Sequence, residues 1–520
     1  MKPIATDIYT FANLISDGYM YVDKTDRLLE LVSPGRGKQF FFSRPRRFGK
    51  SLTVSTLQAI FEARRNLFAG LAIDRSDYDW RKYPVIRLDM STTFAETVED
   101  FHRQVFVALQ FAANRLGLTV DRSETAAGAF LNLINDAAAM SEDGQVVLLV
   151  DEYDKPLLGH LGRPTVEAFR SALKSFYSVV KATEEVQRFT FITGVSKFSK
   201  VSIFSDLNNL TDLTMDARMA TLAGYTHGEV KRYFADHLAA LGEANGLTTE
   251  GAFDRVVQMY DGYRFHYAAE PVFNPVSLGR CLSDTEFRSY WYETGTPTFL
   301  VNMLKAHPVD ISGIEASEEE LGTYEPSNPS LVPLLYQTGY LTIKGFRVLG
   351  NKRRYALDFP NEEVRDAFNS SLMPVYTDIG GIELGTIQDR CVEALFDHDM
   401  DGFFESLRDF FSNIPYTLTD RGGEQVWQAI FYTVLRFIGV CVKAEVVTNR
   451  GRIDAVIQCP NEIYVVEVKL DKSAQEALDQ IREKDYAAKY RASGRRITLI
   501  GINFSSRARQ IDDWIVAEDK

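Results

Sequence analysis

The chain has 520 residues, of which 45% are apolar and 25% are charged, and its formal net charge is −13. This composition is that of a soluble globular protein, and the length predicts two to four domains. The opening residues carry a charge before any apolar run, so no secretory segment is expected. The longest apolar stretch, 429–447, contains Arg436, Lys443 and Glu445, which excludes a membrane span. Four scattered cysteines without Cys-x-x-Cys spacing do not indicate zinc and favour the reducing cytoplasm.

A phosphate-binding loop is predicted near the N-terminus. The apolar run Phe40–Phe42 is typical of a short buried strand, and 52–64 is typical of a helix. Between them lies Arg44-Pro45-Arg46-Arg47-Phe48-Gly49-Lys50-Ser51. In a P-loop, backbone N–H groups at a helix N-terminus bind phosphates, Lys reaches the β and γ oxygens, and the Ser hydroxyl binds Mg²⁺. We expect Lys50 and Ser51 to take these roles, although Arg44 stands where the motif has its first Gly.

Two further strands are predicted to complete a nucleotide site. Val146–Val150 is apolar throughout, as in a strand buried on both faces, and it ends in Asp151 and Glu152. Asp151 is expected to hold Mg²⁺ through water, and Glu152 to polarise the attacking water. A third strand, 189–194, ends in polar residues, so Thr193 or Ser196 could sense the γ-phosphate.

These motifs resemble the AAA-ATPase-like family, in which Arg-Pro-Arg-Arg-Phe-Gly-Lys-Ser is the usual form of the loop. The resemblance extends to the motifs 21–25, 151–154 and 207–212. It implies a P-loop domain over 1–215, with a parallel sheet and helices on both faces, that binds ATP and Mg²⁺. Carried over residue by residue, the nucleotide site comprises Arg46, Arg47, Phe48, Gly49, Lys50, Ser51, Leu52, Asp151, Thr193 and Ser196.

The loop cations leave alternatives open. Arg46, Arg47, Lys197 and Lys200 could each contact phosphate, but solvated surface charge explains the two loop arginines equally well. No arginine finger can be assigned. Because AAA-type ATPases often complete their sites across subunits, the resemblance implies a homo-oligomer.

The region 216–380 is expected to be a helical lid followed by a winged-helix-like module. Thr226–Glu229 begins a lid-like helix, and the motif Tyr260-Asp261-Gly262-Tyr263-Arg264-Phe265 is interpreted as an aromatic turn between helices. The segment 331–343 predicts helix, turn and strand, and 354–360 predicts a partner strand. The acidic stretch 308–323 is predicted to be an exposed loop.

A second chemical motif lies near the C-terminus. Gly451-Arg452-Ile453-Asp454 and Glu467-Val468-Lys469 each adjoin a strand-like apolar run, with a turn predicted over 458–462. A hairpin of this kind brings Asp454 close to Glu467. Since side chains alternate along a strand, Glu467 and Lys469 share a face that Val468 does not.

This arrangement suits a divalent metal. Mg²⁺ prefers oxygen ligands and is typically held by one or two carboxylates plus substrate phosphate. Asp454 and Glu467 are the expected ligands, with Mn²⁺ as an alternative ion, and Lys469 could orient the attacking water or neutralise developing charge. The competing interpretation is an ordinary hairpin with a surface Glu/Lys pair.

The flanking segments strengthen the metal-site interpretation. Upstream, Glu424 opens a predicted apolar helix that runs to about Val442; downstream, 474–490 predicts an amphipathic helix that carries Gln480 and Lys484 on one face. The pattern resembles the PD-(D/E)XK nuclease superfamily, which implies a restriction-endonuclease-like α/β domain over 381–520. The corresponding residues are Glu424, Asp454, Glu467, Lys469, Gln480 and Tyr486. Helix capping explains Glu424 equally well.

A nucleic-acid partner, DNA or RNA, is expected despite the net charge. Between 482 and 509 eight basic residues outnumber two acidic ones, although a solvated helix face explains about half of them. Two functions therefore compete. In the first, ATP binding controls a nuclease that cuts DNA or RNA, in a setting such as defence against foreign nucleic acid. In the second, the protein is a nucleotide-dependent switch whose nuclease-like domain only binds nucleic acid or a protein.

Overall fold

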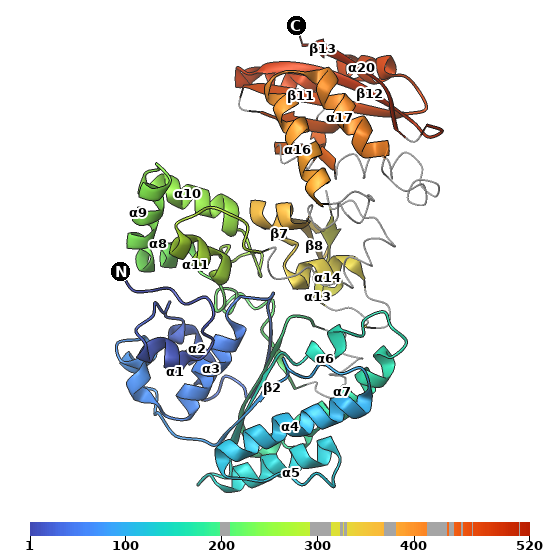
Figure 1. The fold of residues 1–520 in the computed structure, drawn as a ribbon. Coiled ribbons are helices and arrows are strands. Elements are labelled where there is room, and N and C mark those ends of the chain that lie inside the picture. The colour runs from blue at the N-terminus through green and yellow to red at the C-terminus, as the bar shows by residue number, and fades with distance from the viewer. Residues whose placement is uncertain are drawn as a thin grey trace. The chain divides into compact units, whose positions relative to one another are not determined.

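The computed structural model divides the chain into two compact units (Figure 1). Unit 1 comprises Met1–Thr294 and Glu315–Val364, and unit 2 comprises Gly295–Ile314 and Arg365–Lys520. The structure describes residues 1–197, 209–291, 314–322, 326, 330–368, 381–412, 434–435, 441–448, 451–459, 461–508 and 510–519.

Unit 1 is built on a parallel sheet in the order β2-β3-β4-β1-β5. The strands are β1 (Gln39–Ser43), β2 (Val85–Asp89), β3 (Val146–Asp151), β4 (Gln187–Gly194) and β5 (Thr211–Asp212). All residues of β1 and β3 are buried. Helices cover both faces of a parallel sheet, so its strands are continuous apolar runs. The predicted strands at 40–42, 146–150 and 189–194 are confirmed.

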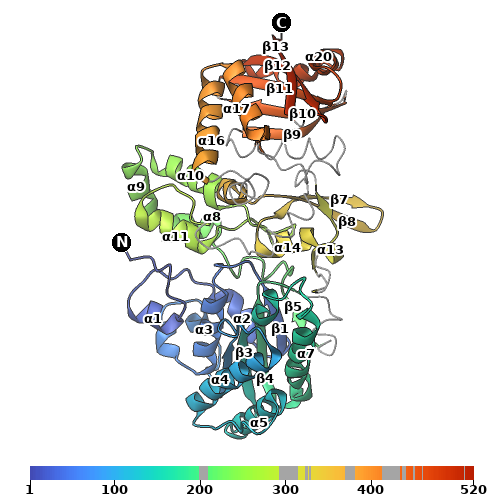
Figure 2. The same ribbon diagram turned by 45° about the vertical axis from the view of Figure 1, so that its right-hand side comes forward.

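The helices around this sheet pack through aromatic side chains. Phe130 of α5 stacks on Phe176 of α7 at 4.9 Å, and Phe101 of α4 lies 6.0 Å from Phe169 of α7. Figure 2 shows these three helices together beside the sheet. The helical elements are α1 (Phe11–Ser16), α2 (Thr25–Val32), α3 (Lys50–Phe61), η1 (Arg65–Phe68), η2 (Ile73–Arg75), α4 (Val98–Leu116), α5 (Ala126–Ala139), α6 (Lys155–Leu158), α7 (Val166–Ala182) and η3 (Glu184–Val186).

The rest of unit 1 contains a helical cluster and a small sheet in the order β6-β8-β7. The predicted helix at 226–229 is confirmed, because Thr226 and Glu229 form a reciprocal capping box at the start of α8. The predicted helix, strand and partner strand correspond to α14, β7 and β8. These elements are α8 (His227–Tyr233), α9 (Ala235–Ala244), α10 (Thr249–Tyr260), α11 (Pro275–Asp284), β6 (Glu315–Ala316), α13 (Glu318–Gly322), α14 (Leu331–Thr338), β7 (Thr342–Leu349) and β8 (Lys352–Asp358).

The prediction of an exposed loop over 308–323 is wrong for its described part. Residues 315–322 form β6 and α13, and Leu321 is fully buried. Ser317 and Glu320 exchange side-chain hydrogen bonds with each other's backbone N–H groups, which caps α13. The acidic composition of this stretch favoured a loop and concealed the Ser-x-x-Glu spacing of a capping box.

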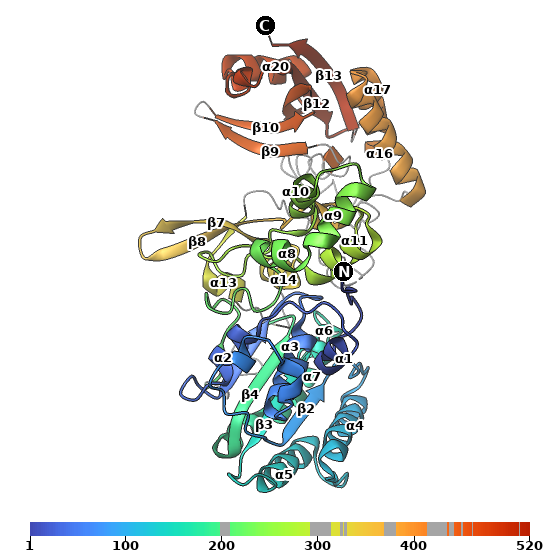
Figure 3. The same ribbon diagram turned by 90° about the vertical axis from the view of Figure 1, so that its left-hand side faces the viewer.

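Unit 2 is a five-stranded sheet in the order β13-β12-β11-β10-β9, in which only the β11–β12 pair is parallel. Helices α16 and α17 lie on one face and α20 on the other (Figure 3). Phe404 and Phe411 of α17 contact Trp514 and Phe504 of the sheet, so the helix packs on it through aromatic side chains. The elements are α16 (Gly381–Phe396), α17 (Met400–Ser412), β9 (Cys441–Thr448), β10 (Gly451–Gln458), β11 (Glu462–Leu470), α20 (Ala474–Glu483), η5 (Tyr486–Lys489), η6 (Arg491–Ser493), β12 (Arg496–Ser505) and β13 (Gln510–Glu518).

Two predicted helix boundaries near the C-terminus are corrected. The helix expected over 474–490 ends at Glu483, because Asp485 takes a left-handed conformation (φ 48°) before the η5 turn. The apolar helix expected to run to about Val442 must end before Cys441, where β9 begins; most of the segment before β9 lies outside the described residues. In the part of the chain that the structure describes, no helix combines the length and apolar character needed to cross a membrane.

Candidate nucleotide and metal sites

The phosphate loop lies between β1 and α3. Gly49 precedes α3 with a left-handed backbone (φ 83°), which a side chain would strain. The Lys50 ammonium donates to the carbonyls of Arg44 and Pro45, both at 3.0 Å, and so closes the loop on itself. No side chain caps the N-terminus of α3. Its first backbone N–H groups therefore form an anion cradle of the kind that binds phosphate.

Acidic side chains face this cradle from the end of β3. Burial lowers the pKa of Lys50, and the charges of Glu152, Asp151 and Asp154 oppose that shift. Burial also raises the pKa of Asp151, while a hydrogen bond from Ser51 opposes the rise. The structure thus brings Lys50, Ser51 and Asp151 together. Such a group could hold Mg²⁺ beside a triphosphate.

The end of β4 is held by Asp154, a residue whose role the sequence did not assign. Its buried carboxylate accepts hydrogen bonds from the backbone N–H groups of Val195 (3.1 Å) and Ser196 (2.7 Å). Burial raises the pKa of Asp154 to about 6. The Thr193 hydroxyl donates to the Phe42 carbonyl at 2.7 Å, so that group is engaged within the sheet. The one sequence signal for this role was the position of Asp154 in the motif 151–154.

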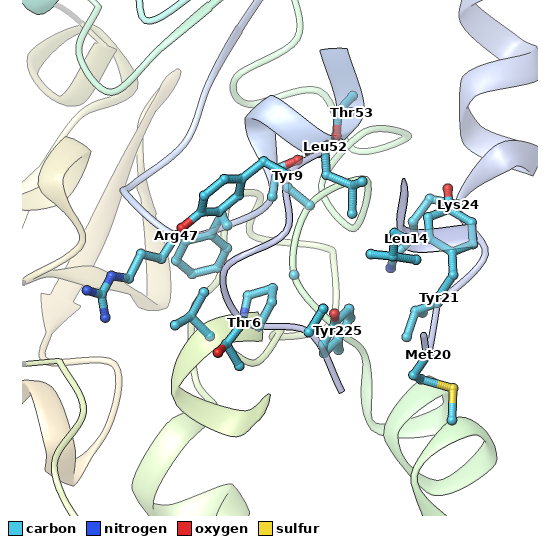
Figure 4. Close-up of a pocket in the computed structure, with 18 of the residues that line it drawn as sticks. Thr6, Tyr9, Leu14, Met20, Tyr21, Lys24, Arg47, Leu52, Thr53 and Tyr225 are labelled. Atoms are coloured by element: carbon cyan, nitrogen blue, oxygen red, sulfur yellow. Dashed lines mark hydrogen bonds between the residues drawn. The ribbon is translucent and has the colours of Figure 1, made fainter. Parts of the chain in front are cut away.

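An apolar cavity of about 100 Å³ opens beside the loop (Figure 4). Phe48, Gly49 and Leu52 form one wall, and the segment 4–9 and Tyr225 form others. Lys24 also lines it and is held by Glu229 and by the Thr221 carbonyl. An apolar cavity next to a phosphate cradle has the composition that suits a nucleotide base. Sequence reasoning missed it because its walls come from segments more than 200 residues apart.

The loop cations occupy different environments. Arg44 is buried, stacks between Phe42 (4.3 Å) and Phe265 (4.1 Å), and donates to the carbonyls of Thr214 and Met219. Lys197 forms an ion pair with Asp212. Arg46 and Arg47 are half-buried. Lys200 lies outside the described residues.

The second site lies on the β10–β11 hairpin of unit 2. One Asp454 carboxylate oxygen accepts the Val468 backbone N–H at 2.9 Å, which places Asp454 beside Glu467. The Lys469 ammonium lies 3.2 Å from a Glu467 oxygen and donates to the Gln480 amide oxygen at 2.7 Å. The Gln480 amide in turn donates to Glu467. The structure therefore brings Asp454, Glu467, Lys469 and Gln480 together.

A divalent cation fits this arrangement. Glu467 is 2% exposed, and its second carboxylate oxygen has no hydrogen-bond partner among the described residues. Burial and the Asp454 charge raise the pKa of Glu467 to about 7. A cation between the two carboxylates would relieve both the repulsion and the orphaned oxygen. In the described ranges, which omit 413–433, no three His, Cys, Asp or Glu side chains are grouped to hold a metal ion.

Three other expectations for this site have different outcomes. Glu424 lies outside the described residues. Tyr486 is 3% exposed and packs in the apolar core with Val456 and Ile463, so its ring serves the core. The arginines at 491, 495 and 496 contact Asp519, Cys459 and Glu518 near the start of β11 and β12. Glu462, where β11 starts, is about 16 Å along the strand from Glu467. These three arginines therefore do not surround the metal site.

The fold and the two groups define a class of protein: a P-loop ATPase-like domain joined to a nuclease-superfamily domain. Residues 4–204 match the family model described as "Predicted AAA-ATPase", and residues 422–514 match the "PD-(D/E)XK nuclease superfamily". The chain is 36% identical over 529 residues to a protein of Azotobacter chroococcum mcd 1 described as "Uncharacterized protein in vnfD 5'region", with 99% of each chain covered. The chain belongs to the family of that protein, and both predicted resemblances are confirmed.

Proposed function

We propose that the protein binds and hydrolyses ATP and uses it to control a Mg²⁺-dependent nuclease that cuts phosphodiester bonds of DNA or RNA. The observation that carries the nuclease is the convergence of Asp454, Glu467, Lys469 and Gln480 around a buried carboxylate oxygen without a partner. When bound, the metal ion would lower the pKa of a water molecule and offset charge on the phosphate.

The residues of the chain supply the remaining chemistry. Asp454 and Glu467 would hold the ion, and Gln480 orients the Glu467 carboxylate through the hydrogen bond that it donates. The Lys469 ammonium can neutralise charge on the phosphate or orient the attacking water. At the P-loop, Lys50 and the N-terminus of α3 would bind the phosphates, and Ser51 and Asp151 would hold Mg²⁺. Glu152 would orient water, and Thr193 or Ser196 would sense the γ-phosphate.

Nicking and degradation of labelled DNA and RNA, with Mg²⁺ or Mn²⁺ and with or without ATP, test the nuclease. Asp454→Ala should lower cleavage by about 100-fold or more, the scale on which single electrostatic contacts to a transition state act. Asp479→Asn, on the exposed side of α20, is the matched control and should cleave like the wild type. Equal inactivity of wild type and Asp454→Ala on every substrate would favour a domain that only binds.

Calorimetric titration with ATP tests the nucleotide site. Lys50→Ala should abolish ATP binding, because it removes the ammonium that would reach the β and γ phosphate oxygens. Lys38→Ala is the matched control: this lysine lies in the glycine-containing turn before β1 and pairs with Glu184 on the surface. Undiminished ATP affinity in Lys50→Ala would contradict the phosphate cradle.

A further inference from the structure

The P-loop of this chain is covered by residues that lie more than 200 positions away in the sequence. The Phe48 ring packs edge-on against Tyr263 at 4.8 Å and Phe265 at 5.4 Å. Phe265 also stacks on the Arg44 guanidinium. The aromatic motif 260–265 therefore packs against the loop. The sequence alone did not suggest this contact.

The two adjacent loop arginines, Arg46 and Arg47, have different surroundings. The positive charge of Arg46 contributes to the lowered pKa of Lys50, so Arg46 lies near the Lys50 ammonium. The Arg47 guanidinium instead lies 3.5 Å from the Tyr290 carbonyl oxygen and points away from the apolar cavity (Figure 4). The Arg47 backbone is left-handed, with φ 67°. A non-glycine residue keeps this conformation only where its surroundings hold it.

A buried carboxylate fixes the backbone that receives Arg47. Glu363 is fully buried, and one of its oxygens accepts the N–H groups of Tyr290 at 2.6 Å and Trp291 at 2.9 Å. Burial raises the pKa of Glu363 to about 7, and the nearby positive charge of Arg47 opposes this rise. Glu363 thus supports the backbone whose Tyr290 carbonyl faces the Arg47 guanidinium, and the charges of Glu363 and Arg47 attract each other through the space between them.

The aromatic motif in turn places Glu363. Asn361 donates to the Asp261 carbonyl at 2.7 Å and accepts the Val364 N–H at 3.0 Å, which fixes the turn that carries Glu363. Gly262 permits this approach, because an added Cβ would clash with the Pro360 carbonyl. The contacts form a continuous chain from the motif through Glu363 to the loop.

We propose that Glu363 is a positioning residue of the nucleotide site: it anchors the Arg47 side chain, and the anchor keeps the loop backbone in its phosphate-binding conformation. Arg47 then serves the phosphates through the loop backbone that its side chain holds in place. This inference rests on the proposed ATP-binding function of the loop.

The test is a set of double-mutant cycles, with the affinity for Mg²⁺ and ATP measured by calorimetry on the full chain at pH 8, where Glu363 is ionised. Glu363→Gln keeps an acceptor for both N–H groups and removes only the charge, so a merely structural role would survive it. We expect affinity to fall about tenfold, the scale of one charge-assisted contact. The fall should vanish in an Arg47→Ala background and persist in an Arg46→Ala background. At pH 6 it should shrink, because Glu363 is then protonated.

Glu362→Gln is the matched control, since that neighbouring carboxylate is exposed and pairs with Arg255 on the surface; it should bind ATP like the wild type. Unchanged affinity in Glu363→Gln, or an equal loss in the Arg47→Ala background, would overturn the proposal. A second comparison does not depend on the folding of Glu363→Gln: Arg47→Lys should retain most of the affinity and Arg47→Gln should lose it. Equal affinities for those two variants would also overturn it.

The failure of this inference can be told apart from that of the proposed function. If Lys50→Ala binds ATP as tightly as the wild type, the nucleotide site itself is wrong. If Lys50→Ala loses ATP binding but Glu363→Gln does not, only the positioning role fails.

Discussion

At the scale of single residues, Arg44 shows why the P-loop departs from the usual glycine pattern. Its guanidinium is buried between two aromatic rings and donates to the carbonyls of Ser43, Thr214 and Met219. Burial lowers its pKa to about 9, so the charge persists at neutral pH. Arg44 therefore joins the loop to the segment that follows β5. A glycine at this position would give the loop a more familiar sequence and remove that connection.

We expect Arg44→Gly to destabilise unit 1 by about 2–4 kcal/mol, because three carbonyls lose their donor and a large cavity opens. Differential scanning calorimetry would measure the shift in the unfolding midpoint. Arg46→Gly, two positions along the same loop, is the control and should shift the midpoint much less. An Arg44→Gly protein as stable as the wild type would show that the stacked guanidinium contributes little.

At the scale of elements, the placement of α20 on the sheet depends on Gly501 of β12. A Cβ added there would clash with the Ala474 carbonyl and lie 2.7 Å from the Leu478 nitrogen, both of which are backbone atoms of α20. Because backbone cannot rotate away as a side chain can, the helix itself would have to shift. That helix carries Gln480, whose amide contacts Glu467 and Lys469.

Gly501→Ala should therefore lower cleavage as well as the stability of unit 2, since it moves Gln480 without touching any proposed metal ligand. The measurement is nuclease activity beside the unfolding midpoint. Gly385→Ala in α16 is the matched control, because nothing lies within 4 Å of the added Cβ and alanine favours a helix. Full activity in Gly501→Ala would contradict the tight helix placement.

At the scale of the whole molecule, the division into two compact units predicts how the chain unfolds. Each unit has its own sheet and its own buried core, so we expect two thermal transitions in place of one. Arg44→Gly should lower one transition, and Gly501→Ala the other. A single cooperative transition that both variants shift equally would show that the units fold as one.

Much of the fold could be predicted from the sequence, because local patterns carried it. Continuous apolar runs marked β1, β3 and β4, and the alternation in 462–470 placed Glu467 and Lys469 on one face. The end of the helix at Glu483 could not be predicted, since it depends on a left-handed Asp485 within an amphipathic pattern. The hidden capping of α13 was missed for a similar reason.

The two sites differ in how far the sequence described them. Lys50, Ser51 and Asp151 follow motifs whose spacing specifies their geometry, and the structure brings them together. The apolar cavity, Asp154 and Glu363 were not found, because their partners are distant in the sequence and single buried acids have no local pattern. The sequence could not distinguish the roles of Arg46 and Arg47, which are adjacent and of the same type. Only their surroundings in the structure distinguish them.

The sequence by itself determined which segments become strands and helices and which residue types could do chemistry, because these follow from periodicity, capping and short motifs along the chain. Only the tertiary structure decided which charges are buried, which side chains meet, and which of two adjacent arginines lies beside the Tyr290 carbonyl. The physical reason is that burial and pairing depend on contacts between segments far apart in the sequence, and these contacts set the pKa of Glu363 and the direction of the Arg47 side chain.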